Sequence, residues 1–225
     1  MTEKKSAEES VGIPIGVPIL LYGPVGSGKT TFSLRMAKEF LGRNLPLIWV
    51  CLDESPLNIR KKLSYFGVDN ENLEKKNLVR YVDVYTEYVT GKALDEPYVL
   101  NCSSVSDLTE VNIALNTARK ELKGGGLLVV DSVSTLLLYT NADICEKFLR
   151  ITTGRFKSDD YTGLFILQKG MHSAEVEETM KMIADAVMGF EVDKGSWKVS
   201  IIKKPLTQKT AKLLIGTGNV LSEAK

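Results

Sequence analysis

The chain is poor in the residues that build metal centres and disulfide frameworks. It has one histidine, His172, and three cysteines, Cys51, Cys102 and Cys145, which stand far apart and form no Cys-x-x-Cys pair. Zinc sites and disulfide-rich domains need such residues in clusters at short spacings, so the sequence argues against both. The low cysteine content suits a reducing compartment.

Long apolar runs and an excess of one charge are also missing. The longest apolar stretches, residues 127–130 and 136–139, have the length of strands, whereas a membrane helix needs roughly 18 apolar residues. The formal net charge is +1, which argues against a nucleic-acid or anionic-membrane binder. Residues 1–11 are polar, without the apolar core of a signal peptide. We therefore expect them to be a disordered tail of a cytoplasmic protein.

What the sequence does contain is an alternation of strand-like and helix-like segments. Its 225 residues are 44% apolar and 25% charged, which suits one soluble domain, here residues 12–225. Strands are expected at residues 17–22, 47–52, 78–85, 127–131 and 164–168, helices at residues 30–41, 56–67, 107–122, 143–153 and 175–186, and a long surface loop at residues 86–104. Three further strand-like runs follow at residues 186–192, 197–203 and 211–215.

This order predicts the α/β fold class. The expected architecture is a central, mostly parallel twisted sheet with helices on both faces and a C-terminal antiparallel meander. The strand at residues 127–131 is the most apolar and should be central, because a strand covered on both faces by helices is apolar on both sides.

A glycine-rich segment between the first strand and the first helix matches the P-loop pattern at every fixed position. Its residues are Gly23, Pro24, Val25, Gly26, Ser27, Gly28, Lys29 and Thr30. The glycines let backbone N–H groups turn inward toward phosphate oxygens, and the helix that follows favours anions at its N-terminus. Lys29 is expected to reach the β- and γ-phosphates, the Thr30 hydroxyl to ligate Mg²⁺, and Thr31 to lie by the α-phosphate. A magnesium-bound nucleoside triphosphate is the predicted ligand.

A second metal-site residue is expected where a buried strand ends. Asp131 follows four apolar residues, at the carboxyl end of the strand and therefore beside the expected phosphates. We predict that it holds the magnesium through a water molecule. The alternative is that its side chain only caps the turn that begins at Ser132.

Further polar residues end two other strands on the same edge of the sheet. Asp53 and Glu54 follow the strand after the P-loop helix, and either carboxylate is a candidate to orient and deprotonate an attacking water. The alternative is that Asp53, Glu54 or Ser55 caps the helix that begins near Pro56. Gln168 ends the strand at residues 164–168, where it is either a sensor of the γ-phosphate or an ordinary strand-end residue.

These pieces, in this order, resemble the KaiC-like ATPases of the RecA superfamily, in a single-module form of the kind common in archaea. Besides the P-loop, the matching segments are residues 11–16 (VGIPIG), 51–56 (CLDESP), 66–69 (FGVD), 130–134 (VDSVS), 162–165 (TGLF) and 183–187 (IADAV). The resemblance runs from Gly12 to about Lys204. It implies ATP as the nucleotide, Glu54 and Asp53 as the catalytic acidic pair and Gln168 as the sensor. It also implies assembly into hexameric rings or filaments with ATP between subunits.

The chain departs from the family pattern at two places. The family carries a Lys-x-Arg that acts on the neighbouring subunit's nucleotide; here the lysine falls at Lys203 or Lys204, and Pro205 stands where the arginine is expected. Because a missing arginine finger lowers phosphoryl-transfer rates by orders of magnitude, ring-dependent hydrolysis is in question. Lys181 and Met182 replace the paired hydroxyls that clock members phosphorylate.

Three functions follow from this reading. The first is magnesium-dependent ATP binding and slow hydrolysis in a regulatory or signalling role, by a protein with an unknown protein partner. The second is a nucleotide-dependent switch or assembly factor with little turnover. The third is a recombinase-related ATPase associated with DNA, which the near-neutral charge argues against. No residue pattern reads the adenine, so the choice of ATP over GTP comes from the resemblance alone.

Overall fold

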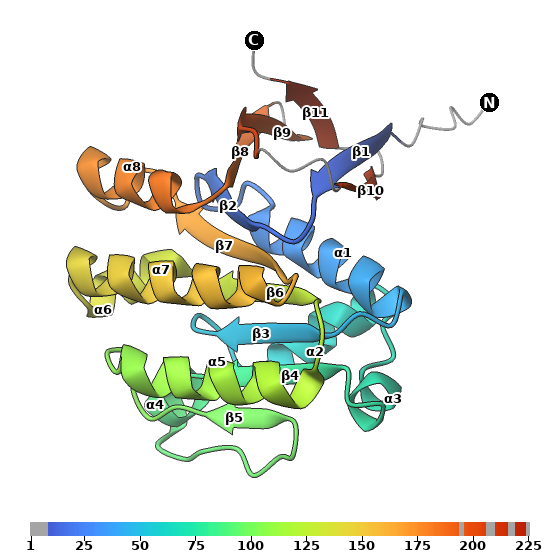
Figure 1. Ribbon diagram of the computed structural model, residues 1–225, viewed down its shortest axis with the longest axis vertical. Helices are drawn as coiled ribbons and strands as arrows, with labels where there is room; N and C mark the ends of the chain where they lie inside the picture. Colours follow the sequence, from blue (N-terminus) through green and yellow to red (C-terminus); the bar gives the residue numbers. More distant parts are fainter. Residues whose placement is uncertain (1–8, 194–195, 206–209, 216–218, 224–225) are drawn as a thin grey trace.

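A nine-stranded, mostly parallel sheet organises the chain (Figure 1). The structure is a computed structural model that describes residues 9–193, 196–205, 210–215 and 219–223. Across the sheet the strands are β11 (Asn219–Glu223), β9 (Ser196–Lys203), β8 (Ala186–Asp193), β2 (Pro18–Gly23), β7 (Thr162–Gln168), β6 (Leu127–Asp131), β3 (Leu47–Cys51), β4 (Val79–Asp83) and β5 (Val99–Asn101). All strands from β8 to β5 run parallel.

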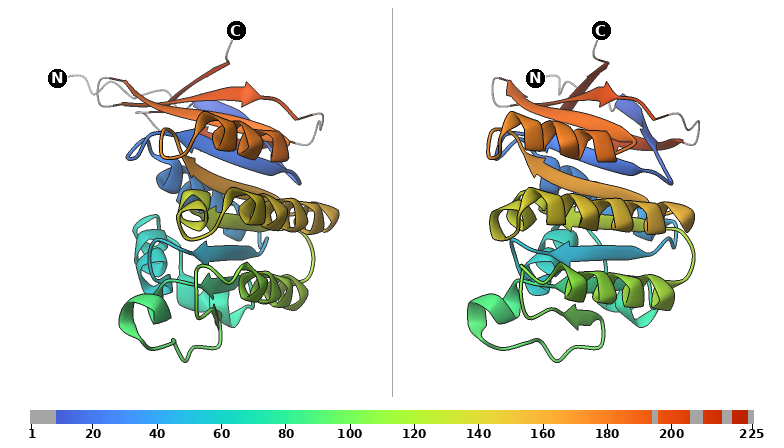
Figure 2. Two further views of the ribbon diagram at one scale, coloured as in Figure 1. Left: turned by 90° about the vertical axis from the view of Figure 1, so that its left-hand side faces the viewer. Right: turned by 60° about the vertical axis from the view of Figure 1, so that its left-hand side comes forward.

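Helices cover both faces of this sheet, as Figures 1 and 2 show. One face packs against α1 (Lys29–Gly42) and α2 (Pro56–Tyr65), with α3 (Asn70–Lys75) at its rim. The other face packs against α5 (Leu108–Leu122), α6 (Val133–Tyr139), α7 (Ala142–Ser158) and α8 (Ala174–Ile183). The short α4 (Thr86–Thr90) follows β4.

Alternation along each strand divides the core between these two layers. In β3, Trp49 belongs to the cluster under α1 and α2, whereas Ile48 and Val50 belong to the cluster under α5 and α7. All three side chains are 0% exposed. Strands apolar on both faces are what a parallel sheet between two helix layers requires. The predicted α/β class, parallel sheet and two-sided helix arrangement are thereby confirmed.

The expected long loop at residues 86–104 is wrong, because it contains α4 and the three-residue strand β5. The strand β5 extends the sheet by pairing with β4, and strands of this length carry no clear alternation. The apolar stretch at residues 136–139 belongs to helix α6, which begins where Ser132 accepts a hydrogen bond from the Thr135 amide. The helix α3 was also not expected.

The C-terminal strands are antiparallel in part, as expected, but they are not joined into one continuous meander. The strand β9 pairs antiparallel with β8. The next strand, β10 (Thr210–Ile215), leaves this sheet and pairs antiparallel with β1 (Glu9–Pro14), and β11 then returns to lie parallel to β9.

The termini of the chain bear on two other expectations. Residues 1–8 of the predicted tail lie outside the described residues, and the tail's last three residues instead begin β1. The single domain at residues 12–225 stays a prediction. In the described ranges, no helix is long and apolar enough to cross a membrane.

Candidate functional site

The P-loop joins β2 to α1 at the carboxyl edge of the sheet. Gly26 and Gly28 have φ angles of +76° and +91°, the left-handed region that glycine adopts without strain. Gly28 is the N-cap of α1, and no side chain caps this helix. The first N–H groups of a helix have no helical carbonyl to bond, so this end of α1 is free to bind an anion.

Lys29 lies inside the loop with its ammonium group held by the loop itself. Its side chain is buried, and Nζ donates to the carbonyl oxygens of Gly23 at 2.7 Å and Pro24 at 2.6 Å and to Ser27 Oγ at 3.2 Å. Burial lowers the pKa of Lys29 to about 8, an effect that the nearby charge of Asp131 partly offsets. A buried ammonium whose pKa is lowered gains from a phosphate placed beside it.

Thr30 and Asp131 meet from two different elements. The Thr30 hydroxyl donates to Asp131 Oδ2 at 3.0 Å. Asp131 is buried at the end of β6, and burial, followed by the charge of Asp53, raises its pKa to about 7. A carboxylate and a hydroxyl are oxygen ligands of the kind Mg²⁺ takes, and Mg²⁺ in nucleotide sites is held by one or two protein groups together with phosphates. These two residues therefore fit a magnesium ion that arrives with a nucleotide.

Asp53 and Glu54 are free of the capping role that the sequence left open for them. Ser55 is the N-cap of α2, and its side chain accepts from the Asn58 amide. Asp53 accepts a hydrogen bond from the Thr135 hydroxyl. Glu54 Oε1 forms an ion pair with Lys62 Nζ at 2.6 Å.

Gln168 stands beside the P-loop, because its position on β7 is in register with Gly23 on β2. Its backbone N–H donates to Ser134 Oγ at 2.8 Å, which fixes the end of the strand. Its side-chain oxygen is buried, and no hydrogen-bond partner for it lies among the described residues. A buried amide oxygen of this kind is costly unless a ligand or a water bonds to it.

Part of the P-loop and Gln168 border one pocket of about 280 Å³, whereas Asp131, Asp53 and Glu54 are not among its described lining residues. Its lining residues are Gly26, Ser27, Gly28, Lys29, Thr30, Thr31, Gln168 and Trp197. The structure thus brings together the P-loop residues and Gln168, with Asp131 bonded to Thr30 and with Asp53 close enough to shift the pKa of Asp131. Trp197 was missed, because it lies on β9 and nothing near it in the sequence points to the P-loop.

Other residues considered from the sequence lie in ordinary structural settings. Lys203 Nζ donates to the carbonyl oxygen of Ala184 at 2.6 Å and lies 3.4 Å from the carbonyl oxygens of Lys181 and Met182. It thus caps the C-terminal end of α8 within its own chain. His172 has a buried Nε2, and burial lowers its pKa.

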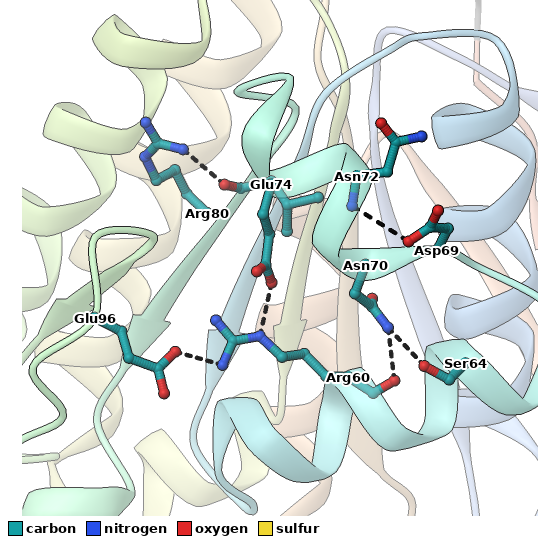
Figure 3. Close-up of polar contacts among 9 residues, drawn as sticks. Arg60, Ser64, Asp69, Asn70, Asn72, Glu74, Arg80 and Glu96 are labelled. Carbon is teal, nitrogen blue, oxygen red and sulfur yellow. Dashed lines mark hydrogen bonds and ion pairs between the residues drawn. The ribbon is translucent and has the colours of Figure 1, made fainter.

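A second polar cluster, shown in Figure 3, lies between α2, α3 and the segment before β5. Arg60 forms ion pairs with Glu74 at 2.7 Å and Glu96 at 2.5 Å, and Asn70 Nδ2 donates to the Arg60 carbonyl and to Ser64 Oγ. These residues border an open groove of about 580 Å³. Because two carboxylates already neutralise its arginine, this groove does not suit a phosphate ligand.

Comparisons with known proteins agree with this geometry. The family model described as the KaiC ATPase matches residues 7–199 of the chain. A UPF0273 protein of Thermotoga maritima is 30% identical over 201 residues, which cover 85% of this chain and 78% of that protein. A UPF0273 protein of Pyrococcus horikoshii is 33% identical over 129 residues, which cover 56% of this chain and 50% of that protein. The match thus spans about half the length of this second relative.

One solved structure adds support for the fold. The crystal structure of the flagellar accessory protein FlaH from Methanocaldococcus jannaschii aligns with a TM-score of 0.65 and 18% identity, covering 89% of this chain and 85% of that one. At this identity the similarity concerns the fold alone.

Proposed function

The chain belongs to the KaiC family of ATPases, and from this premise we propose that it binds ATP with magnesium and hydrolyses it slowly, in a regulatory or signalling role. The observation that carries the proposal is the convergence of Lys29, Thr30 and Gln168 on one pocket, with Asp131 bonded to Thr30. Oriented cations, a hydroxyl–carboxylate pair and an unpaired amide oxygen are the groups that phosphoryl transfer uses.

Binding follows from the electrostatics of the pocket. The N–H groups at the start of α1 and the ammonium of Lys29 face the β- and γ-phosphates, and the carbonyls of Gly23 and Pro24 keep that ammonium in place. Thr30 and Asp131 would hold the magnesium, Asp131 through a water. When bound, the magnesium supplies positive charge to the phosphate oxygens. Thr31 lies on the side of the α-phosphate.

Hydrolysis requires a base for the attacking water, and Glu54 is the proposed residue. The water oxygen forms a bond to the γ-phosphorus, the bond from that phosphorus to the β–γ bridging oxygen breaks, and the proton of the water passes to the Glu54 carboxylate. Lys62 must release Glu54 Oε1 for this step, because the ion pair at 2.6 Å occupies the oxygen that would take the proton. Asp53 is the second carboxylate of the acidic pair, beside Glu54 in the sequence, and Gln168 orients the γ-phosphate.

We propose slow turnover because Lys203, the residue that would act across a subunit interface, is already hydrogen-bonded within its own chain. Lys203 bonds to the end of α8 in its own chain, and Pro205 stands in place of the family's arginine. The same observation favours the second candidate function, a nucleotide-dependent switch or assembly factor with little turnover. Both candidates allow a homo-oligomer with nucleotide at the interface.

One experiment tests the proposal and separates the candidates. Binding of Mg-ATP and its hydrolysis are measured for the wild type, for Glu54→Gln and, as a matched control, for Glu71→Gln on the exposed face of α3. We expect Glu54→Gln to bind ATP like the wild type and to hydrolyse it about 100- to 10,000-fold more slowly, the range for a lost general base, with Glu71→Gln unchanged. Hydrolysis unaffected by Glu54→Gln would refute the assigned base. ATP binding without turnover in the wild type would favour the switch, and no binding at all would refute the proposed function.

A further inference from the structure

The aromatic side chain of Trp197 packs directly on the P-loop. A Cβ placed on Gly28 would lie 2.5 Å from Trp197 Cδ2 and 2.6 Å from Trp197 Cε3, far inside any permitted contact. Gly28 therefore has two reasons to be a glycine, its positive φ and the indole against its Cα. The contact joins the helix start that faces the phosphates to β9, which follows it by more than 160 positions in the chain.

The sheet order explains how this tryptophan reaches the loop. The strand β8 lies beside β2, which leads into the P-loop, and β9 pairs antiparallel with β8. Figure 1 shows β9 and β8 beside β2 at the top of the molecule. Trp197 lies near the start of β9, in register with Val192 near the end of β8. The antiparallel pairing of β9 with β8 thereby places the indole at the carboxyl edge, where the P-loop lies.

The size of the pocket indicates which part of a nucleotide meets this indole. About 280 Å³ is slightly below the roughly 300–1,000 Å³ of pockets that bury whole drug-sized ligands. The P-loop side of this space suits the phosphates, so the nucleoside must extend past its rim. Trp197 lines this space, it is partly exposed, and it is the one aromatic among the described lining residues.

We propose that Trp197 is the stacking platform for the base of the bound nucleotide, an inference that rests on the proposed nucleotide binding. Stacking on an aromatic face accepts any base, because every base has a π-face. Stacking does not read the hydrogen-bonding edge that distinguishes adenine from guanine, and purines offer the larger π-face. The site therefore takes purine nucleoside triphosphates as a class, with affinities for ATP and GTP that differ by less than about tenfold.

Calorimetric titrations with three ligands test this role. The wild type, Trp197→Ala and Trp197→Phe are each titrated with Mg-ATP, Mg-GTP and magnesium tripolyphosphate, which has the phosphates but no base. Trp197→Ala should weaken both nucleotides by roughly 5- to 150-fold, the range for one base–aromatic stack. It should leave tripolyphosphate within about twofold, and Trp197→Phe should restore most of the nucleotide affinity. Thermal unfolding without ligand checks that both variants are folded.

Other outcomes overturn the inference in recognisable ways. Equal weakening of tripolyphosphate and ATP would mean that Trp197 only supports the shape of the P-loop. Unchanged nucleotide affinity in Trp197→Ala would mean that the base lies elsewhere, and a strong preference for ATP over GTP would contradict purine tolerance. A wild type that binds none of the three ligands would instead refute the proposed function itself.

Fluorescence gives a second readout that a purely structural role would not produce. The chain has two tryptophans, and Trp49 is 0% exposed inside β3. Mg-ATP should therefore change the emission of the wild type but not that of Trp197→Phe, and tripolyphosphate should change neither. An equal response of the wild type to tripolyphosphate and to ATP would argue against stacking.

Discussion

The hydroxyl of Thr30 donates a hydrogen bond to the carboxylate of Asp131, 3.0 Å away and 101 positions later in the chain. This bond ties the first turn of α1 to the end of β6, at the point where a magnesium ion is proposed to lie. Burial and the charge of Asp53 raise the pKa of Asp131 to about 7. A cation bound at Thr30 and Asp131 would therefore be favourable. In the nucleotide-free protein, ionising the buried Asp131 costs free energy.

That cost predicts how stability depends on pH. Between the ordinary carboxyl pKa near 4 and the folded-state value of about 7, the folded state binds a proton that the unfolded state has released. The contribution of Asp131 to stability therefore falls as pH rises through this window. Asp131→Asn removes the ionisable group, so its melting temperature should exceed that of the wild type above pH 7 and approach it near pH 4.

Thermal unfolding of the nucleotide-free protein from pH 4 to 8 measures this difference. Glu71→Gln is the control, because Glu71 is exposed on α3 and its ion pair with Lys75 lies at the surface. A gap between Asp131→Asn and the wild type that stays constant across the pH range would contradict the prediction. The same variant should lose magnesium-dependent ATP binding, since the carboxylate that destabilises the empty site is the one proposed to hold the ion.

The second prediction concerns the contribution of Lys29 to nucleotide affinity. Its ammonium is expected to make charge-assisted bonds to phosphate, so Lys29→Ala should raise the Kd for Mg-ATP by at least about 100-fold. Its pKa of about 8 means that the empty site loses this charge above pH 8, and Asp131 loses its charge below pH 7. The Kd of the wild type should therefore be lowest between pH 7 and 8.

Isothermal titration across pH 6 to 9 measures both effects, with Lys38→Ala as the control on the exposed face of α1. A Kd that does not change with pH would contradict the proposed pairing of these charges. An affinity of Lys29→Ala equal to that of Lys38→Ala would contradict phosphate binding by the loop.

The third prediction concerns a buried carboxylate that links the P-loop strand to the segment after Gln168. Glu177 on α8 accepts from the Tyr22 hydroxyl and from the Gly170 N–H, both at 2.6 Å. Glu177→Ala leaves both donors unpaired, which should lower the free energy of unfolding by about 2–5 kcal/mol. Tyr22→Phe removes one bond and should cost about 1–2 kcal/mol.

Urea unfolding of the two single variants and the double variant gives the coupling between them. Because both changes remove the same bond, the double variant should be less destabilised than the sum of the singles. Strict additivity would mean that the Tyr22–Glu177 bond contributes nothing to stability.

The fourth prediction tests what Lys203 does. As a cation at the C-terminal end of α8 it should stabilise the fold by roughly 0.3–2 kcal/mol. Lys203→Ala should lower stability by that amount and leave the ATPase rate per subunit unchanged. The matched control is Lys198→Ala, at an exposed position on the same strand.

Rates measured over a range of protein concentrations complete this test. A rate that rises with concentration in the wild type but not in Lys203→Ala would show that the lysine acts across an interface, contrary to the prediction. A rate that rises equally in both proteins would point to another residue of the neighbouring subunit.

The sequence by itself determined the features that are local in the chain. A P-loop is eight consecutive residues in which glycines shape the backbone and one lysine side chain reaches the phosphates, so its pattern can be read without the fold. The ends of the apolar strands were also readable, because burial on both faces leaves a continuous apolar run. Asp131, Asp53, Glu54 and Gln168 were therefore expected on one edge of the sheet, and parallel pairing places them there.

Only the tertiary structure decided the relationships between distant segments. Ser55 rather than Asp53 or Glu54 caps α2 because of the backbone path out of β3. Trp197 reaches Gly28, Lys203 caps α8, and β10 pairs with β1 through the order in which strands add to the sheet. Such pairings depend on packing across more than a hundred residues in some cases, and no short pattern in the sequence records them.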